Sequence, residues 1–309
     1  MKKIDDVPSR ESVNNLLGII RPGSRLISIL PVDGGYSNFT HLIDAVDPDG
    51  RPFKIVIRRY AVFGSYERGQ KARREFMALK FAHENGIPTP EPLYLDETGE
   101  VLGIPGIVTS FVDGKIDLTP PNPEYRAKRI AEVLVKIHSL PCAIPDGSYI
   151  LDANAEASWF LRDDKAPDYM KSHPLGFDVV KAARELFPSV KSVKPSLVHI
   201  DIWPGNILWK DDKISAMVDW EEAAYGDPAI DVGYCRMELS VAGYFSAADT
   251  LLETYESLIG KSLDNLLFWE LAAIARPIFS PEIWDVVDNQ RSVRFTSYIE
   301  GVLRKCKLR

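Results

Sequence analysis

Short apolar runs broken by turn signals fill the stretch from residue 26 to residue 59. The runs cover residues 26–32, 39–46 and 53–59. The segments that separate them are Asp33-Gly34-Gly35 and Asp47-Pro48-Asp49-Gly50. Aspartate followed by glycine between apolar runs favours tight hairpin turns. The pattern therefore predicts an antiparallel meander of three strands joined by two turns.

A helical pattern follows the third run. Small or apolar residues, with one carboxylate at the border of their stripe, recur at three- and four-residue spacing: Ala72, Glu75, Phe76, Leu79 and Ala82. Gly86 and Pro88 supply the stop signal of this helix. Further along, residues 104–112 predict one more buried strand.

The texture of the chain changes near Gly114. A stiff, proline-rich connector covers residues 118–123, and helical periodicity dominates after it. The first helical face comprises Ala127, Ile130, Ala131, Leu134 and Ile137, and later helical patterns cover residues 251–259, 263–276 and 286–303. We therefore expect two parts: residues 1–113, mainly strands, and residues 114–309, mainly helices.

Composition excludes several classes of protein. The 37 Lys and Arg residues are outnumbered by 44 Asp and Glu residues, so the formal charge is −7 and the basic footprint of a nucleic-acid partner is missing. No apolar run approaches the roughly 18–20 residues of a membrane span. The three cysteines, Cys142, Cys235 and Cys306, form no paired motif, and no apolar segment follows the charged start of the chain. We expect a cytoplasmic protein without disulfides, membrane contact or nucleic-acid partner; its oligomeric state is not indicated.

Polar side chains that could take part in catalysis lie between apolar residues in the segment 197–209. This segment contains His199, Asp201 and Asn206, with Pro204-Gly205 allowing the chain to turn between the last two. Thirteen residues further on, Asp219 ends another apolar run. Buried polar groups cost free energy unless they are paired. Two carboxylates and an amide suit a hard divalent cation such as Mg²⁺, which prefers oxygen ligands.

The order His-x-Asp-x-x-x-x-Asn followed by a separate Asp is the spacing used by phosphoryl-transfer enzymes of kinase type. On these residues the chain resembles the aminoglycoside phosphotransferase and choline-kinase-like family, the small-molecule branch of the protein-kinase-like fold. The resemblance runs from about residue 26 to residue 231. It implies an α+β protein of two lobes, an N-terminal antiparallel sheet with one helix and a larger, mainly helical C-terminal lobe, with the nucleotide in the cleft between them.

The resemblance also implies roles for individual residues. Asp201 matches the catalytic base that takes the proton of the acceptor hydroxyl, and Asn206 and Asp219 match the ligands of Mg²⁺. Arg58 matches the strand residue, often Lys, that holds the nucleotide phosphates, and Glu75 matches its ion-pair partner on the helix. The implied co-substrate is ATP, or GTP.

Further segments match less specific parts of the family pattern. The phosphate-covering turn corresponds to residues 33–38, with Gly34, Gly35, Ser37 and Asn38. The hinge corresponds to residues 109–114, where the backbone of Ser110 and Val112 would bind adenine, and Asp227 and Asp231 match a segment that supports the catalytic loop. One departure concerns Ile200, because the family commonly has Gly there and a β-branched residue restricts the backbone.

Ordinary structural interpretations accompany these roles. The glycine pair alone is typical of a hairpin turn, Arg58 and Glu75 alone would suit a surface pair, and His199 alone suits a core histidine. Among functions, a kinase of a small hydroxylated molecule competes with a protein-kinase-like regulatory nucleotide-binding protein and with a two-metal phosphohydrolase. The hydrolase needs more metal ligands than this segment offers. A regulatory pseudokinase should lack one of the three site residues, which are all present.

The phosphate acceptor is indicated only by acidic and aromatic residues. These are Glu221, Glu222, Glu270, Glu282, Asp285 and Asp288, beside Trp269 and Trp284. Carboxylates with aromatic walls would hold a cationic amine. The hypothesis is therefore a hydroxylated acceptor bearing an amine, such as an aminoglycoside or an amino alcohol; a solvated helix face with core tryptophans explains the same residues.

Overall fold

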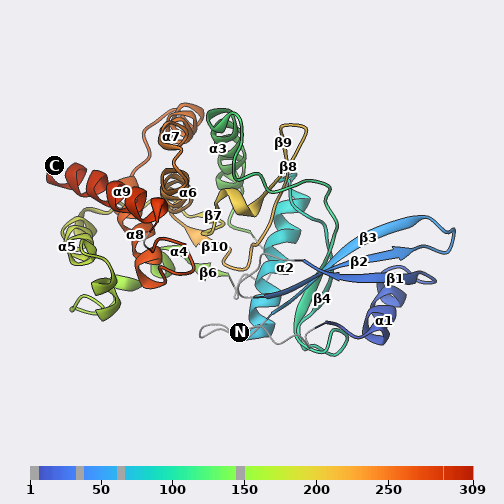
Figure 1. Ribbon diagram of the computed structural model, residues 1–309. Helices are drawn as coiled ribbons and strands as arrows, with labels where there is room; N and C mark the ends of the chain where they lie inside the picture. The colour runs from blue at the N-terminus through green and yellow to red at the C-terminus, as the bar shows by residue number, and fades with distance from the viewer. Residues whose placement is uncertain (1–6, 33–37, 61–66, 144–149, 288, 309) are drawn as a thin grey trace. The chain divides into compact units, whose positions relative to one another are not determined.

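The computed structural model describes residues 7–32, 38–60, 67–143, 150–287 and 289–308 (Figure 1). The described residues form two compact units. The first contains residues up to Gly114 together with residues 215–222, and the second contains residues 115–143, 150–214 and 223–308. Residues 215–222 belong to the first unit although the residues on either side of them in the sequence belong to the second. A division of the chain at a single position therefore does not describe the two units.

A five-stranded antiparallel sheet forms the centre of the first unit. The strands β1 (Arg25–Pro31), β2 (Asn38–Val46), β3 (Pro52–Tyr60), β4 (Pro92–Asp96) and β5 (Gly106–Ser110) lie in the order β1-β2-β3-β5-β4. Every neighbouring pair is antiparallel. The predicted meander is confirmed as β1 to β3, and the predicted buried strand is β5.

Two helices pack on this sheet and use opposite sides of β3. Helix α1 (Arg10–Ile20), which we did not predict, shares a buried apolar cluster with Ile55 and Ile57. Side chains alternate along a strand, so Arg58 points to the other side. There it meets Glu75 of α2 (Arg68–Glu84), the helix predicted from periodicity. The chain leaves α2 through Gly86, whose φ of 74° suits glycine.

Helices dominate the second unit. They are α3 (Pro123–Ser139), α4 (Ala153–Ala157), α5 (Gly176–Leu186), α6 (Ala229–Ala242), α7 (Phe245–Ile259), α8 (Leu266–Phe279) and α9 (Gln290–Lys307). A small sheet has the order β6 (Leu151–Asp152), β10 (Ala224–Gly226), β7 (Ser196–Val198). A two-stranded ribbon of β8 (Ile207–Lys210) and β9 (Lys213–Met217) follows the 3₁₀ turn Pro204–Asn206.

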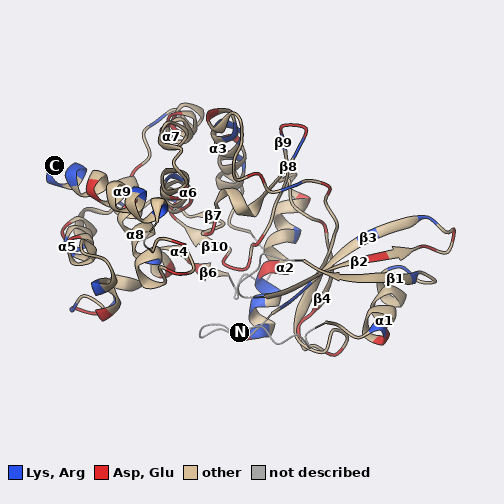
Figure 2. Ribbon diagram, viewed as in Figure 1, with Lys and Arg blue, Asp and Glu red and all other residues tan. Residues whose placement is uncertain are grey.

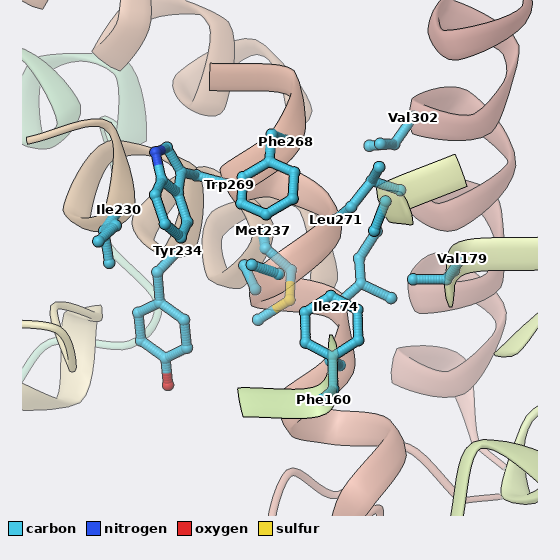
Figure 3. Packing of buried hydrophobic residues seen from close by; sticks show 14 of the residues in the cluster. Phe160, Val179, Ile230, Tyr234, Met237, Phe268, Trp269, Leu271, Ile274 and Val302 are labelled. Carbon is cyan, nitrogen blue, oxygen red and sulfur yellow. The ribbon is translucent and has the colours of Figure 1, made fainter. Parts of the chain in front are cut away.

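Helix α8 is the centre of the second unit's core, because it is apolar on nearly every side. Figure 3 shows its residues Trp269, Leu271 and Ile274 packed against side chains of α5, α6 and α9, among them Met237 of α6. This packing fixes α6 and α8 relative to each other, and both helices carry residues of the site described below.

Charged residues of both signs are interspersed along both units (Figure 2). Within the part of the chain that the structure describes, we find no helix whose length and apolarity would suit a membrane span.

Candidate active site

Asp231 anchors the loop that carries the predicted catalytic residue. Its buried carboxylate accepts hydrogen bonds from the backbone N–H groups of His199 (2.9 Å) and Ile200 (2.7 Å) and from His138 Nε2 (3.1 Å). Burial opposes the charged form, but the interactions with His138 and His199 outweigh it and hold the pKa of Asp231 below its ordinary value. Asp231 is therefore a structural carboxylate, which ties the start of α6 to the end of β7.

Ile200 adopts a left-handed backbone conformation, with φ of 68°. A β-branched residue is rare there, because its side chain crowds the backbone. This conformation gives a physical reason why glycine suits the position, which the sequence had marked as a departure. The strained backbone is held on both sides, since Asp231 accepts from its N–H and Arg276 Nη1 donates to its carbonyl (3.1 Å).

Asp201 follows directly and exposes about a quarter of its side chain (26%). Asn206 Nδ2 donates to Asp201 Oδ2 (3.0 Å) and to the Asp201 carbonyl (2.8 Å). The Tyr234 hydroxyl donates to the other carboxylate oxygen, Oδ1 (2.8 Å), and Arg276 Nη1 lies 4.0 Å from that oxygen. The structure thus brings the predicted residues Asp201 and Asn206 together.

Sequence reasoning missed Tyr234 and Arg276. A signal existed for Tyr234, because it follows Asp231 by three residues on a helix and so lies on the same face. Arg276 has no local signal, since α8 lies far along the chain from the catalytic loop.

In the first unit, Arg58 is surrounded by carboxylates. Its guanidinium forms ion pairs with Glu75 (Nε to Oε2, 3.2 Å), with Glu221 (Nη2 to Oε2, 3.3 Å) and with Asp219. Burial would lower the pKa of Arg58, but Asp219, Glu75 and Glu221 raise it above its ordinary value, so the residue stays charged. The predicted pair of Arg58 and Glu75 is present, and Asp219 joins it.

The carboxylates around Arg58 differ in electrostatics. Burial, partly offset by Arg58, raises the pKa of Glu75 to about 7, and the Tyr60 hydroxyl donates to its carboxylate. For Glu221 burial is outweighed by Arg58, by Lys71 and by a hydrogen bond from Asn38 Nδ2 (2.6 Å), which together lower its pKa. Glu221, which we had placed in the acceptor site, therefore belongs to the Arg58 group, and the sequence reasoning is corrected on this point.

The chemistry of this group suits a divalent cation. Carboxylate oxygens of Glu75, Asp219 and Glu221 lie within 4.8 Å of one another. Mg²⁺ prefers such hard oxygen ligands and keeps waters or phosphate oxygens in its remaining positions. Asp219 has φ of 69°, a left-handed conformation uncommon for a residue other than glycine. Asn206, the other predicted ligand, lies in the second unit and offers an amide oxygen.

The remaining predicted nucleotide residues have the following places. Gly34, Gly35 and Ser37 lie outside the described residues, and Asn38 is buried at the start of β2. Ser110 ends β5, and its backbone N–H donates to the Glu91 carbonyl (2.8 Å). Val112, two residues further along the chain, is half-buried. The adenine-binding role of these two backbones stays a prediction.

The prediction that Glu270 and Trp269 of α8 bind the acceptor is wrong. Glu270 is almost fully buried, where Arg236 Nε donates to its carboxylate (2.9 Å) and the Tyr298 hydroxyl does the same (3.2 Å). Trp269 is equally buried and donates to Asp227 (2.8 Å). Both residues stabilise the core, because most of helix α8 is buried in the second unit. Trp284 and Glu222 are half-buried, Glu282 and Asp285 are exposed, and Asp288 lies outside the described residues.

Known proteins resemble this chain in sequence and in fold. The model of the phosphotransferase enzyme family matches residues 28–263. Mouse acyl-CoA dehydrogenase family member 10 is 24% identical over 234 residues, which are 72% of this chain and 21% of that protein. The 4-hydroxytryptamine kinase of Psilocybe cyanescens is 24% identical over 193 residues, which are 53% of each protein. The chain thus spans between about a fifth and about half of these two relatives.

A solved structure from Ralstonia eutropha JMP134, of a protein assigned as an aminoglycoside phosphotransferase, has the same fold. The TM-score is 0.70 at 18% identity, and the match covers 97% of this chain and 98% of that one. The predicted fold class, α+β of the protein-kinase-like type, is confirmed.

Proposed function

The chain belongs to the phosphotransferase enzyme family, and we propose that it transfers the γ-phosphate of ATP to a hydroxyl of a small molecule. The observation that carries this proposal is the partly exposed carboxylate of Asp201, held by Asn206 and Tyr234 on a loop that Asp231 anchors. A positioned carboxylate with an exposed edge is what a general base needs.

Asp201 takes the proton of the acceptor hydroxyl in this proposal. The hydroxyl oxygen then forms its bond to the γ-phosphorus while the bond to the bridging oxygen of ADP breaks. The hydrogen bonds that Asp201 accepts leave carboxylate lone pairs for the substrate proton. The products are ADP and a phosphate ester.

Arg58 binds the nucleotide phosphates in this proposal. A guanidinium offers planar N–H donors that match phosphate oxygens in pairs, so it replaces the more common lysine without loss of charge. Glu75 and Glu221 hold the guanidinium in place from two sides. Asn38 supports Glu221 in turn.

Asp219 would hold Mg²⁺, and Asn206 would supply a further oxygen ligand. When bound, such a cation neutralises the charge of the nucleotide phosphates. Asp201 keeps its role as base in that complex.

The acceptor is a hydroxylated small molecule, and an amine-bearing one is the finer proposal. Its support is the name of the relative that acts on 4-hydroxytryptamine, which carries both a hydroxyl and an amine. ATP as co-substrate is supported by the family, and GTP stays an alternative. The cytoplasmic setting stays a prediction.

A panel of acceptors tests this function. Release of ADP or GDP is measured with aminoglycosides, macrolides, choline, sugars, amino alcohols and hydroxyindoles, and the phosphate ester is identified by mass spectrometry. We expect acceptor-dependent turnover with at least one hydroxylated compound. The exposed Asp178→Asn variant, in the first turn of α5, serves as a matched control and should keep that turnover. Nucleotide binding without acceptor-dependent turnover would favour the regulatory alternative.

A further inference from the structure

Two helices of the second unit direct polar groups at the loop of Asp201. Tyr234 comes from α6 and donates its hydroxyl to Asp201 Oδ1 at 2.8 Å. Arg276 comes from α8, donates Nη1 to the carbonyl of Ile200, and places its guanidinium carbon 4.8 Å from the centre of the Tyr234 ring. Arg276 therefore contacts both the Tyr234 ring and the peptide that precedes Asp201.

The Tyr234 side chain is fixed in one place by the core. It is only 3% exposed and packs with Met237 and Trp269, and Figure 3 shows its hydroxyl directed away from these apolar neighbours. Burial, and secondarily the charge of Asp201, raises the pKa of Tyr234, so the phenol stays neutral and keeps its proton as a donor. A neutral phenol in this place donates permanently to the carboxylate.

We propose that Tyr234 is a positioning residue that fixes the orientation of the Asp201 carboxylate, an inference that rests on the proposed role of Asp201 as base. Asn206 holds Oδ2 and Tyr234 holds Oδ1, so the carboxylate is restrained at both oxygens and cannot turn about its side-chain bonds. With both oxygens restrained, the lone pair that each oxygen keeps has a fixed direction in which it can take the proton of an acceptor hydroxyl.

The backbone before Asp201 does not by itself fix the Asp201 side chain, so the carboxylate needs the two hydrogen bonds. Ile200, at φ of 68°, sets the direction in which Asp201 leaves the chain, but it does not set the rotation of the Asp201 side chain. A base misplaced by about 1 Å loses up to about 10²-fold in rate, because the proton must be taken along a defined line. Tyr234 acts on the rate through its hydrogen bond to Asp201.

Removal of the phenol hydroxyl tests the inference. Tyr234→Phe keeps the ring and its contact with Arg276, and we expect kcat to fall roughly 10–100-fold while the KM values for ATP and acceptor stay within about twofold. Tyr298→Phe is the matched control, since it removes another buried phenol that donates to a carboxylate, Glu270, in the same unit. This control should keep kcat within about twofold.

A double-mutant cycle separates this inference from the proposed function. In the Asp201→Asn background, Tyr234→Phe should cause no further loss, because its effect passes through Asp201. Equal loss in both backgrounds, or a kcat of Tyr234→Phe within twofold of wild type while Asp201→Asn has lost roughly 10²–10⁴-fold, would overturn the positioning role and leave the proposed function intact. A near-normal rate in the Asp201→Asn variant would overturn both.

Should Tyr234→Phe fail to fold, Arg276→Gln tests whether the Tyr234–Arg276 pair positions Asp201. It leaves the phenol but removes the guanidinium that lies over its ring, donates to the Ile200 carbonyl and lies 4.0 Å from Asp201 Oδ1, so kcat should fall at constant KM. That fall should again vanish in the Asp201→Asn background, and an undiminished fall there would contradict the inference.

Discussion

At the scale of single residues, the most informative position is Ile200. A buried isoleucine in the left-handed region combines favourable burial with an unfavourable backbone. Glycine removes the crowding of the backbone but also loses the buried side chain. In Ile200→Gly, relief of the backbone crowding offsets part of the stability that is lost with the side chain. At an ordinary buried isoleucine, the change to glycine brings no such relief, and the greater backbone freedom of glycine adds to the loss.

We predict that Ile200→Gly destabilises the protein by about 1–2 kcal/mol less than Ile202→Gly, because a left-handed L-residue costs about that much. Ile202 lies in the same loop, is fully buried, and is not among the described residues with positive φ. The measurement is urea unfolding of both variants. Equal losses of unfolding free energy would show that the Ile200 backbone is not strained.

Glu238 on α6 is a buried carboxyl whose ionisation matters at neutral pH. Burial raises its pKa to about 7, although Arg291 Nη2 lies 3.6 Å from Oε2 and favours the charge, whereas Asp201 opposes it. A folded-state pKa above the unfolded value means that the folded chain binds more protons. Its stabilising effect is therefore complete below about pH 4.5 and is lost as the pH rises through about 7.

We predict that Glu238→Gln flattens the pH dependence of stability. Between pH 5 and pH 8 the wild-type protein should lose roughly 2–3 kcal/mol more unfolding free energy than the variant. Comparing the two chains cancels the contributions of Glu75 and of the histidines. Parallel curves of unfolding free energy against pH would contradict the raised pKa of Glu238.

At the scale of secondary-structure elements, β3 and α2 act together through Arg58 and Glu75. The ion pair between them is largely buried, with side chains 16% and 3% exposed. Removing one partner therefore leaves the other without its counter-charge in a place that water reaches poorly.

We predict non-additive kinetics for this pair. Arg58→Ala should raise the KM for ATP, and Glu75→Ala should add little in the double variant, because Glu75 acts by holding the guanidinium. Steady-state kinetics of both single variants and the double variant give the coupling. Additive increases in KM would mean that strand and helix contribute separately.

Sequence reasoning reached the elements whose signals are local. The meander β1 to β3 follows from its turn residues, and α2 follows from its spacing and its stop at Gly86. Helix α1 also had a signal, with Ser9 as N-cap and Val13, Leu16 and Leu17 at helical spacing, which we did not use. The contacts of Tyr234 and Arg276 with the catalytic loop depend on how α6 and α8 pack, and no local pattern encodes that.

At the scale of the whole molecule, the chain divides the proposed chemistry between two units. The first holds Arg58 with Glu75, Asp219 and Glu221, and the second holds Asp201 with Asn206, Tyr234 and Arg276. The spacing of Asp201, Asn206 and Asp219 was readable in the sequence, because the three residues lie close together in the chain. The acceptor residues were not, since Glu270 and Trp269 turned out to stabilise the core.

In the proposed function, this chain transfers phosphate with Asp201 as its base. The most direct test is the single-turnover rate of Asp201→Asn with ATP and an acceptor found by the panel, measured beside the Kd for ATP. We predict a rate lower by roughly 10²–10⁴-fold, with the Kd within about twofold of wild type. A near-normal single-turnover rate in this variant would contradict it.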